Sequence, residues 1–245
     1  MHAATPGKVA RVVTFLFYFC WQTSHAAAFS VAPVRVNLDE AANSATVEFG
    51  NTGTEITSMQ VEVMKWSQTE DGVDVYEPSE DLIAVPPIFR LEPGEKQIVR
   101  IGLFGRSAPA ETSFRVFFSE LPQEQPDRVT TPVIKMRLRI GIPVFVASLE
   151  IPAPRLDMVK AARDNNKLSV TFHNPGNTHV QVKWLYVLAE GGDDSDVVAD
   201  GAGAYLLPGT TREFALSIPS DTPVAAVRAE TDTAGTADYA LPADP

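Results

Sequence analysis

One stretch constrains the fold of this chain more than any other, the residues from Thr131 to Val146. Apolar side chains occupy every second position of its first half, and cations or glycine stand between them. The apolar positions are Ile134, Met136, Leu138, Ile140 and Ile142, and the alternate positions are Lys135, Arg137, Arg139 and Gly141. A period of two predicts a β-strand with one apolar face and one basic face.

The apolar face of this strand needs cover, and two kinds of cover fit the pattern. One is an ordinary second sheet of the same protein, which alternation alone favours. The other is the core of a different protein, because a long apolar edge strand is a template for pairing. The rest of the sequence has to decide between them.

Residues 1–28 have the composition of a secretory signal peptide. Two cations precede an apolar and aromatic run, Val12–Trp21, and the segment ends in small residues. We expect cleavage after Ala26 or Ala28. The one cysteine, Cys20, lies inside the run, so the mature chain would have no disulfide and would be stabilised by packing alone.

The charge of the remaining residues is strongly acidic. They hold 18 Lys and Arg against 31 Asp and Glu, a formal net charge of −13. This charge argues against nucleic acid or anionic lipid as a partner. No later apolar run reaches the roughly 20 residues of a membrane anchor. The basic face of the 131–146 strand is a local exception, and specific binding is expected at such an exception.

Two turn motifs occur twice, which predicts two copies of one architecture. The sequence F-G-N-T-G at 49–53 precedes a strand with Q-V-E-V-M-K-W, and F-H-N-P-G at 172–176 precedes Q-V-K-W. In the same way L-E-P-G at 91–94 matches L-L-P-G at 206–209. The two offsets, 123 and 115 residues, are nearly equal.

Many short alternating segments with Pro, Gly and Asn turns between them predict an all-β protein. We expect two immunoglobulin-like β-sandwich domains, 29–148 and 149–245, with the proline-containing stretch Leu149–Arg155 as the connector. Within the first domain, segments 45–49 and 56–66 flank a turn and predict a β-hairpin.

Little in the sequence points to catalysis. His173 and His179 stand six residues apart without a cysteine or a carboxylate pair, which favours surface-turn histidines over a metal site. Nucleophile, phosphate-loop and dinucleotide motifs are absent, and the acidic loop 192–196 lacks calcium-loop spacing. We therefore predict no enzyme, no cofactor and no metal. Trp66 and Trp184 occupy corresponding strands and are predicted to be core residues.

Three arginines are candidates for binding: Arg35 in the first segment, Arg115 in F-R-V-F-F-S-E, and Arg139 on the basic face. Each is either a solvated strand residue or part of a cleft between the domains. In the second case their guanidinium groups could hold a carboxylate by two parallel hydrogen bonds.

Taken together, these features resemble the periplasmic pilus chaperones of the chaperone–usher pathway, over nearly the whole mature chain. The motifs that carry the resemblance are F-S-V-A-P-V-R at 29–35, V-P-P-I-F-R-L-E-P-G-E-K-Q-I-V-R-I at 85–101, F-R-V-F-F-S-E-L-P at 114–122, I-P-V-F-V at 142–146, and the N-P-G-N and L-L-P-G turns of the second domain. The run 85–101 is the most specific of them.

The resemblance implies a non-enzymatic periplasmic protein with its two domains in an L. Such chaperones bind incomplete pilin subunits and deliver them to an outer-membrane usher. The last long strand of the first domain lends apolar side chains to a pilin that lacks its own final strand. By position the donated side chains would be Ile134, Met136, Leu138 and Ile140. When the strand is empty, we expect self-association or a mobile loop to mask it.

The resemblance also implies an anchor for the pilin's C-terminal carboxylate. In the best-known branch one basic residue of the first strand and one of the donor strand form it, and Arg35 and Arg139 occupy the nearest places. The sequences F-R-V-F-F-S-E and I-G-I-P-V-F-V resemble instead the archaic or alternative branch, which makes Arg115 a candidate. The alternative function is a secreted two-domain structural protein or adhesin subunit whose 131–146 stripe packs internally. The third possible function is that of an enzyme with a polar pocket between its domains.

Overall fold

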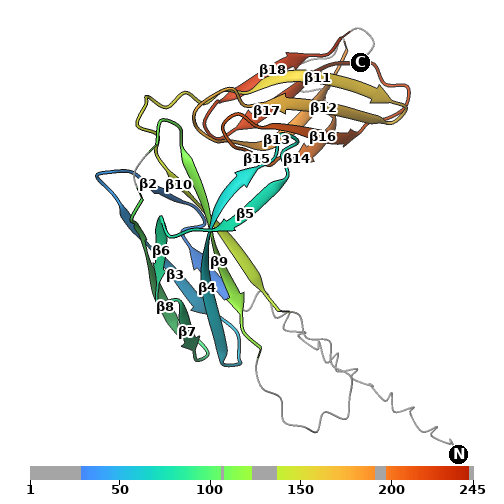
Figure 1. The fold of residues 1–245 in the computed structure, drawn as a ribbon. Coiled ribbons are helices and arrows are strands. Elements are labelled where there is room, and N and C mark those ends of the chain that lie inside the picture. The colour runs from blue at the N-terminus through green and yellow to red at the C-terminus, as the bar shows by residue number, and fades with distance from the viewer. Residues whose placement is uncertain (1–28, 106–107, 123–136, 191–196, 243–245) are drawn as a thin grey trace, which may run out of the picture.

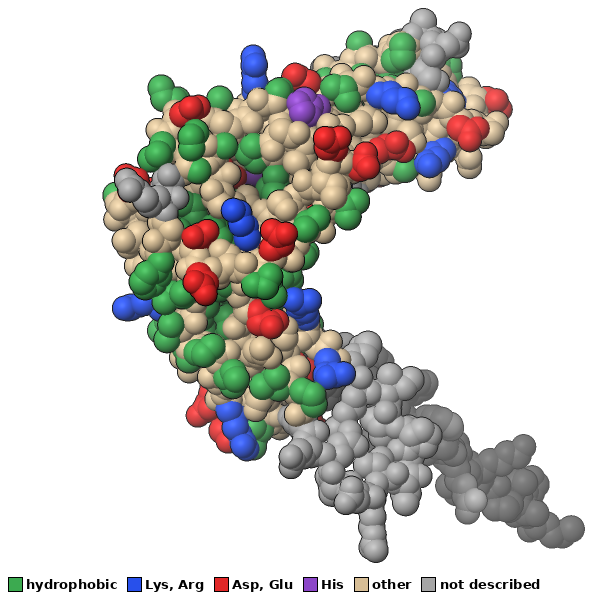
Figure 2. Space-filling view, viewed as in Figure 1, with side chains coloured by type: hydrophobic (Ala, Val, Ile, Leu, Met, Phe, Trp, Pro, Cys, Tyr) green, Lys and Arg blue, Asp and Glu red, His purple; other side chains and the backbone are tan. Residues whose placement is uncertain are grey.

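The computed structural model describes residues 29–105, 108–122, 137–190 and 197–242, and every regular element in them is a β-strand. The strands form two lobes that meet at an angle (Figure 1). In the space-filling view the lobes enclose a concave side (Figure 2). The expected signal peptide, residues 1–28, lies outside the described residues. The described part of the chain contains no helix that is long and apolar enough to cross a lipid bilayer.

The first lobe is a sandwich of two sheets. One sheet contains, in spatial order, β1 (Phe29–Ala32), β3 (Ser44–Asn51), β8 (Lys96–Leu103) and β6 (Leu82–Val85). The other contains β2 (Val36–Leu38), β10 (Arg139–Val146), β9 (Thr112–Glu120), β4 (Thr57–Gln68) and β5 (Asp74–Pro78), and β7 (Ile88–Leu91) pairs with β4.

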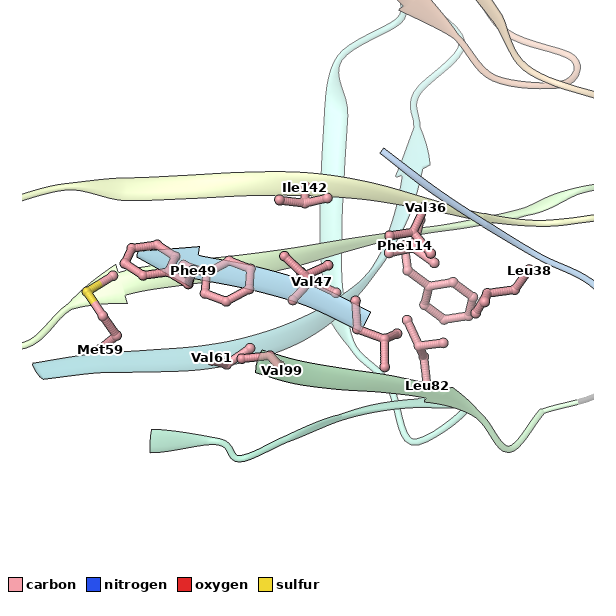
Figure 3. Close-up of a cluster of buried hydrophobic side chains, with 14 of the residues drawn as sticks. Val36, Leu38, Val47, Phe49, Met59, Val61, Leu82, Val99, Phe114 and Ile142 are labelled. Carbon is pink, nitrogen blue, oxygen red and sulfur yellow. The ribbon is translucent and has the colours of Figure 1, made fainter. Parts of the chain in front are cut away.

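Alternate side chains of the two sheets meet in one core (Figure 3). From the first sheet Phe49 and Val99 are fully buried, and from the second Phe114 and Ile142 are 1% and 2% exposed. Each such side chain contributes about 1.5–3 kcal/mol when it leaves water. Burial on this scale fits a sandwich that is stabilised by packing alone.

The second lobe repeats the plan with fewer strands. One sheet contains β11 (Asp157–Asp164), β12 (Lys167–His173) and β16 (Thr211–Ser217). The other contains β14 (Val197–Ala202), β13 (Val180–Ala189), β17 (Val224–Thr231) and β18 (Thr236–Ala240), and β15 (Tyr205–Leu206) pairs with β13. Its core includes Leu168, Phe172, Leu185 and Val227, all at 0% exposure. The predicted fold of two immunoglobulin-like sandwiches is confirmed.

The predicted hairpin around the Asn51 turn is wrong, because β3 and β4 lie in different sheets. The buried Asn51 side chain explains the crossing. Its Nδ2 donates to Glu55 O at 2.8 Å and to Leu91 O at 3.3 Å, and its Oδ1 accepts from Gly53 N at 3.0 Å. Asn174 makes the corresponding contacts between β12 and β13. The repeated asparagine therefore marks a crossover between sheets in both domains.

The prediction that both tryptophans are core residues holds for Trp66 alone. Trp66 is 2% exposed, whereas Trp184 is 44% exposed. An irregularity in the pairing of β13 with β17 lies between Val182 and Trp184. A bulge of this kind inserts one residue and reverses the faces beyond it, so Trp184 points to the outer surface although Val182 points to the core.

Candidate functional site

The strand β10 has an open edge. It pairs with β9 along its whole length, but β2 covers its other side only at Val144–Val146. Among the described residues, no strand pairs with that side over Arg139–Pro143. Glu120 N donates to Leu138 O at 2.9 Å, so the alternation of the ladder directs the N–H groups of Arg139 and Gly141 to the open side. This edge can accept a further strand.

The apolar face of β10 passes from buried to exposed along the strand. Val144 and Ile142 are buried in the core of the first domain at 0% and 2% exposure, and Ile140 is partly buried against it. Leu138 is 37% exposed. Ile134 and Met136, the other two predicted donor residues, lie outside the described residues. The strand thus presents apolar surface at the same end at which its edge is open.

The basic face of β10 carries Arg139 and Gly141 beside an aromatic ring. The Arg139 guanidinium lies 3.9 Å from the centroid of the Phe117 ring, and its Nη2 is 3.9 Å from Glu62 Oε2. A Cβ atom at position 141 would stand 2.8 Å from Phe117 Cε1. Only glycine lets the ring lie this close to the strand. Arg139 is half exposed and is held by weak surface contacts.

Arg115 lies at the boundary with the second domain. Its Nη1 donates to Gly141 O at 3.3 Å, and its guanidinium stands 4.1 Å from the centroid of Trp66 and 5.9 Å from that of Tyr205. Its Nε is buried without a hydrogen-bond partner among the described residues. A guanidinium offers five donors, and the bond to Gly141 O uses one of them, so the Nη groups have donors left for an anion. Burial raises the pKa of Tyr76. The charge of Arg115 lowers this pKa, and the charge of Asp74 raises it further.

Arg35 is engaged within the protein. Its Nη1 forms an ion pair with Asp232 Oδ2 of the second domain. Burial raises the pKa of Tyr205, the nearby Arg35 and Arg115 oppose this rise, and Asp232 adds to it. The structure therefore brings Arg35 and Arg115 to one junction, around Tyr205, while Arg139 lies farther along the sheet over Phe117.

A small apolar cluster joins the two domains. Trp66 and Phe145 of the first domain pack with Leu207 of the second, and Tyr205 packs against them. Gln68 adds polar bonds across the junction. Its Nε2 donates to Tyr205 O at 3.0 Å, and its Oε1 accepts from Leu207 N at 2.9 Å. Because Arg115 rests on Trp66, this cluster fixes the position of its guanidinium.

The prediction that His179 is a surface-turn residue is wrong. It is 6% exposed and lies against the end of β10, with its ring parallel to that of Phe145 at a centroid distance of 3.5 Å. Glu111 and Asp232 flank it. His173 is half-buried, with Nδ1 3.1 Å from Thr210 O. The sequence analysis missed these contacts because the partners lie far apart in the chain: His179 and Glu111 are 68 residues apart, and Arg35 and Asp232 are 197 apart.

A family model gives the class of protein to which the chain belongs. Residues 28–152 match the family described as pili and flagellar-assembly chaperone, PapD N-terminal domain, and the chain belongs to this family. It is an assembly chaperone, a class of proteins without enzymatic activity. The family and the open edge of β10 together favour this class over the structural protein or adhesin subunit. A search among curated proteins gave no match.

Solved structures with the same fold cover almost the whole chain. One is the chaperone–tip adhesion subunit pre-assembly complex CsuC–CsuE from the archaic chaperone–usher Csu pili of Acinetobacter baumannii, with 19% identity, 88% of this chain and 97% of that chain covered, and a TM-score of 0.61. Another is the Pseudomonas aeruginosa CupB2 chaperone, with 17% identity, 87% and 100% covered, and a TM-score of 0.56. A third is the Salmonella enterica SafA pilin in complex with the SafB chaperone, with 19% identity, 87% and 96% covered, and a TM-score of 0.55.

Proposed function

We propose that the protein is a periplasmic chaperone that binds incomplete pilin subunits by donor-strand complementation and delivers them to an outer-membrane usher. The observation that carries the proposal is the open edge of β10, with exposed Leu138 at one end and Arg115 at the other. The solved complexes CsuC–CsuE and SafA–SafB, whose folds resemble this one, each hold a chaperone with a fibre subunit and support a partner of the same class.

The donated surface would be the apolar face of β10 and of the residues before it. Ile140 and Leu138 share the parity of the core residue Ile142, and in the sequence Met136 and Ile134 continue it. A subunit groove that lacks one strand would gain both backbone hydrogen bonds and these side chains. Each fully buried side chain contributes about 1.5–3 kcal/mol before the costs of association.

The carboxylate anchor would be Arg115 in first place. Its guanidinium is held over the Trp66 ring, its Nη groups have donors left, and it lies beside the open edge. Arg139 would be a second, more exposed contact. Arg35 serves the anchor indirectly, because its ion pair with Asp232 holds the second domain at the junction.

Delivery to an usher needs a surface that stays accessible while a subunit covers β10. The outer face of the other sheet offers one. Ile83 and Val85 on β6 and Ile98 on β8 are 40%, 52% and 57% exposed, and the pairing of β6 with β8 places them on the same face. An apolar group of this kind on a surface is typical of a protein contact.

The proposal is tested by co-expression with the secreted small β-rich proteins encoded beside this gene. The wild type should hold one of them in a soluble one-to-one complex. Leu138→Asp should lose the complex while the chaperone keeps its own fold, because position 138 is partly exposed in the free protein. A buried unpaired carboxylate in the subunit groove costs several kcal/mol.

The matched control is Ile98→Asp, which adds the same charge to an exposed apolar position of the opposite sheet. It should leave the soluble complex intact. If Leu138→Asp unfolds the chaperone, or if both variants retain the subunit equally, the donor-strand proposal is wrong.

A further inference from the structure

His179 is delivered to the junction by a rigid turn. Asn174 is fully buried, its Nδ2 donates to Thr178 O at 2.8 Å, and its Oδ1 accepts from Gly176 N at 2.9 Å. The turn ends at His179, whose backbone N donates to Glu111 Oε1 of the first domain at 3.0 Å. The imidazole is therefore fixed at the domain boundary by its own backbone and is not a mobile surface group.

The imidazole lies between carboxylates of the two domains. Its Nδ1 is 2.8 Å from Glu111 Oε1, and its Nε2, which has no hydrogen-bond partner among the described residues, is 3.8 Å from Asp232 Oδ2. The same Oδ2 holds Arg35. Tyr205 stands on another side, with a ring centroid distance of 5.7 Å.

Contacts lead from this imidazole to the anchor. His179 stacks on Phe145 with an interplanar angle of 9°. Phe145 lies 6.0 Å from Trp66 between ring centroids, and the guanidinium of Arg115 rests on Trp66. A change in the strength of the His179 contacts therefore affects the position of Phe145, at the C-terminal end of β10, and through Trp66 the position of the Arg115 guanidinium.

We propose that His179 is a positioning residue for subunit binding: in its protonated form it joins Glu111 and Asp232 across the domain boundary and holds Arg115 in place through Phe145 and Trp66. The inference rests on the proposed function. The inference goes beyond the proposed function because it makes subunit retention depend on pH, with slower release of the subunit at mildly acidic pH.

The electrostatics of the junction give the direction of this dependence. Burial lowers the pKa of His179, but the charge of Asp232, together with the hydrogen bond to Glu111 and its charge, outweighs burial and raises the pKa above 6.5. The contribution of the imidazolium is fully present below 6.5 and is lost as the pH rises through the raised value. Neutral imidazole can still donate Nδ1–H to Glu111, but it loses its attraction to Asp232 and its cation–π contact with Phe145.

The partner carboxylate stays charged throughout this range. Although Asp232 is partly buried, the nearby His179 and the hydrogen bonds from Gln181 N and Arg35 hold its pKa well below 3.8. Protons can reach the imidazole, because a cavity of about 230 Å³ borders His179 and Glu111. In the range in which His179 titrates, the imidazole is therefore the group that changes charge at this boundary.

Two measurements on the free protein test the inference. Histidine NMR gives the titration midpoints of His179 and His173, with each signal assigned by its Gln variant. Trp66 fluorescence in a Trp184→Phe background reports the junction, because Trp66 is 2% exposed and packs on Phe145. We expect the emission to change with the midpoint of His179. His179→Gln should abolish the change, His173→Gln should leave it as in the wild type, and Glu111→Gln should lower the midpoint.

A third measurement connects the junction to binding. The wild-type complex with its co-expressed subunit should dissociate severalfold faster at about pH 8.5 than at about pH 6, a range that spans histidine titration. His173→Gln should behave alike, and His179→Gln should show nearly equal rates. If no subunit is captured by any variant, the proposed function fails, while the two measurements on the free protein still decide the inference. Trp66 emission that is independent of pH, or that follows pH equally in His179→Gln, would overturn it.

Discussion

Replacing Arg115 tests the proposed carboxylate anchor most directly. Its guanidinium lies over the Trp66 ring and near that of Tyr205, and its Nη1 donates to the Gly141 carbonyl. We expect Arg115→Ala to leave the free protein folded, because it removes cation–π contacts with Trp66 and Tyr205 worth about 0.5–1 kcal/mol each and one long hydrogen bond, but no ion pair with a described residue. The loss should appear in the complex instead.

The size of that loss follows from the proposed contact. Removing one partner of a buried, hydrogen-bonded charge pair costs about 2–5 kcal/mol, because the other charge stays buried and unpaired. A cost of about 2–4 kcal/mol raises the dissociation constant about 30- to 1,000-fold. Arg115→Lys keeps the charge but loses the planar fork, so its effect should be intermediate.

The assay is the rate at which a purified complex releases its subunit to an excess of tagged wild-type chaperone. Arg100→Ala is the control, since Arg100 is exposed on β8 of the opposite sheet. Most of the change should be in the dissociation rate, as for other buried contacts. If Arg115→Ala releases the subunit at the wild-type rate, the anchor does not lie at Arg115. If only Arg139→Ala speeds subunit release, the carboxylate anchor is Arg139 and not Arg115.

Three further predictions concern β10 and the domain junction. Gly141→Val should destabilise the protein by about 1–3 kcal/mol and weaken subunit binding, because its Cβ would displace the Phe117 ring; thermal unfolding measures the first effect. Asp232→Asn should lower the unfolding temperature most near neutral pH, and the difference from wild type should shrink as the pH falls below 3.8 through the depressed pKa of the carboxyl. The free wild type should self-associate through the empty strand, with a sedimentation coefficient that rises with concentration, and Leu138→Asp should remain monomeric.

The faces of β10 could be predicted from sequence because the period of a strand is a local property. The parity of Ile140 and Ile142 fixes the buried face, and the same rule places Arg139 on the other one. The run from Ile142 to Val146 also contains a signal that alternation does not explain. Phe145 is apolar at a position of the outer face, which is typical of a strand end buried on both sides. The structure shows that cover, because the second domain packs on Phe145.

The sequence offered Arg35 and Arg115 as residues of a cleft between the domains, but their partners could not be predicted, because the contacts join residues that no sequence pattern relates. The pair of Arg35 and Asp232 spans 197 residues, and the pair of His179 and Glu111 spans 68. The sequence analysis considered only the residues close to His179 in the chain, and no carboxylate pair lies among them. In the fold, one carboxylate comes from the first domain and one from a distant turn of the second. Domain packing decides the chemistry of such residues.

An anchor at Arg115 would also determine the direction of the bound strand. Arg115 pairs with Pro143 across the sheet, at the end of the open edge where β2 begins to cover β10. A subunit whose terminal carboxylate is held there can follow the open edge only toward Arg139. Its last strand would then run parallel to β10, and at about 3.3 Å per residue Arg139 would stand about four residues before the subunit's carboxylate.

This parallel register can be tested by cross-linking, because the segment after residue 28 has no cysteine of its own. Arg139→Cys should form a disulfide with a cysteine placed about four residues before the subunit's C-terminus, within the short Cβ separation that a disulfide allows. The slanted hydrogen bonds of a parallel pair allow a shift of about one residue. Efficient bonding at the terminal residue instead would place the carboxylate near Arg139. The anchor would then be Arg139, and Arg115 would serve only to join the two domains.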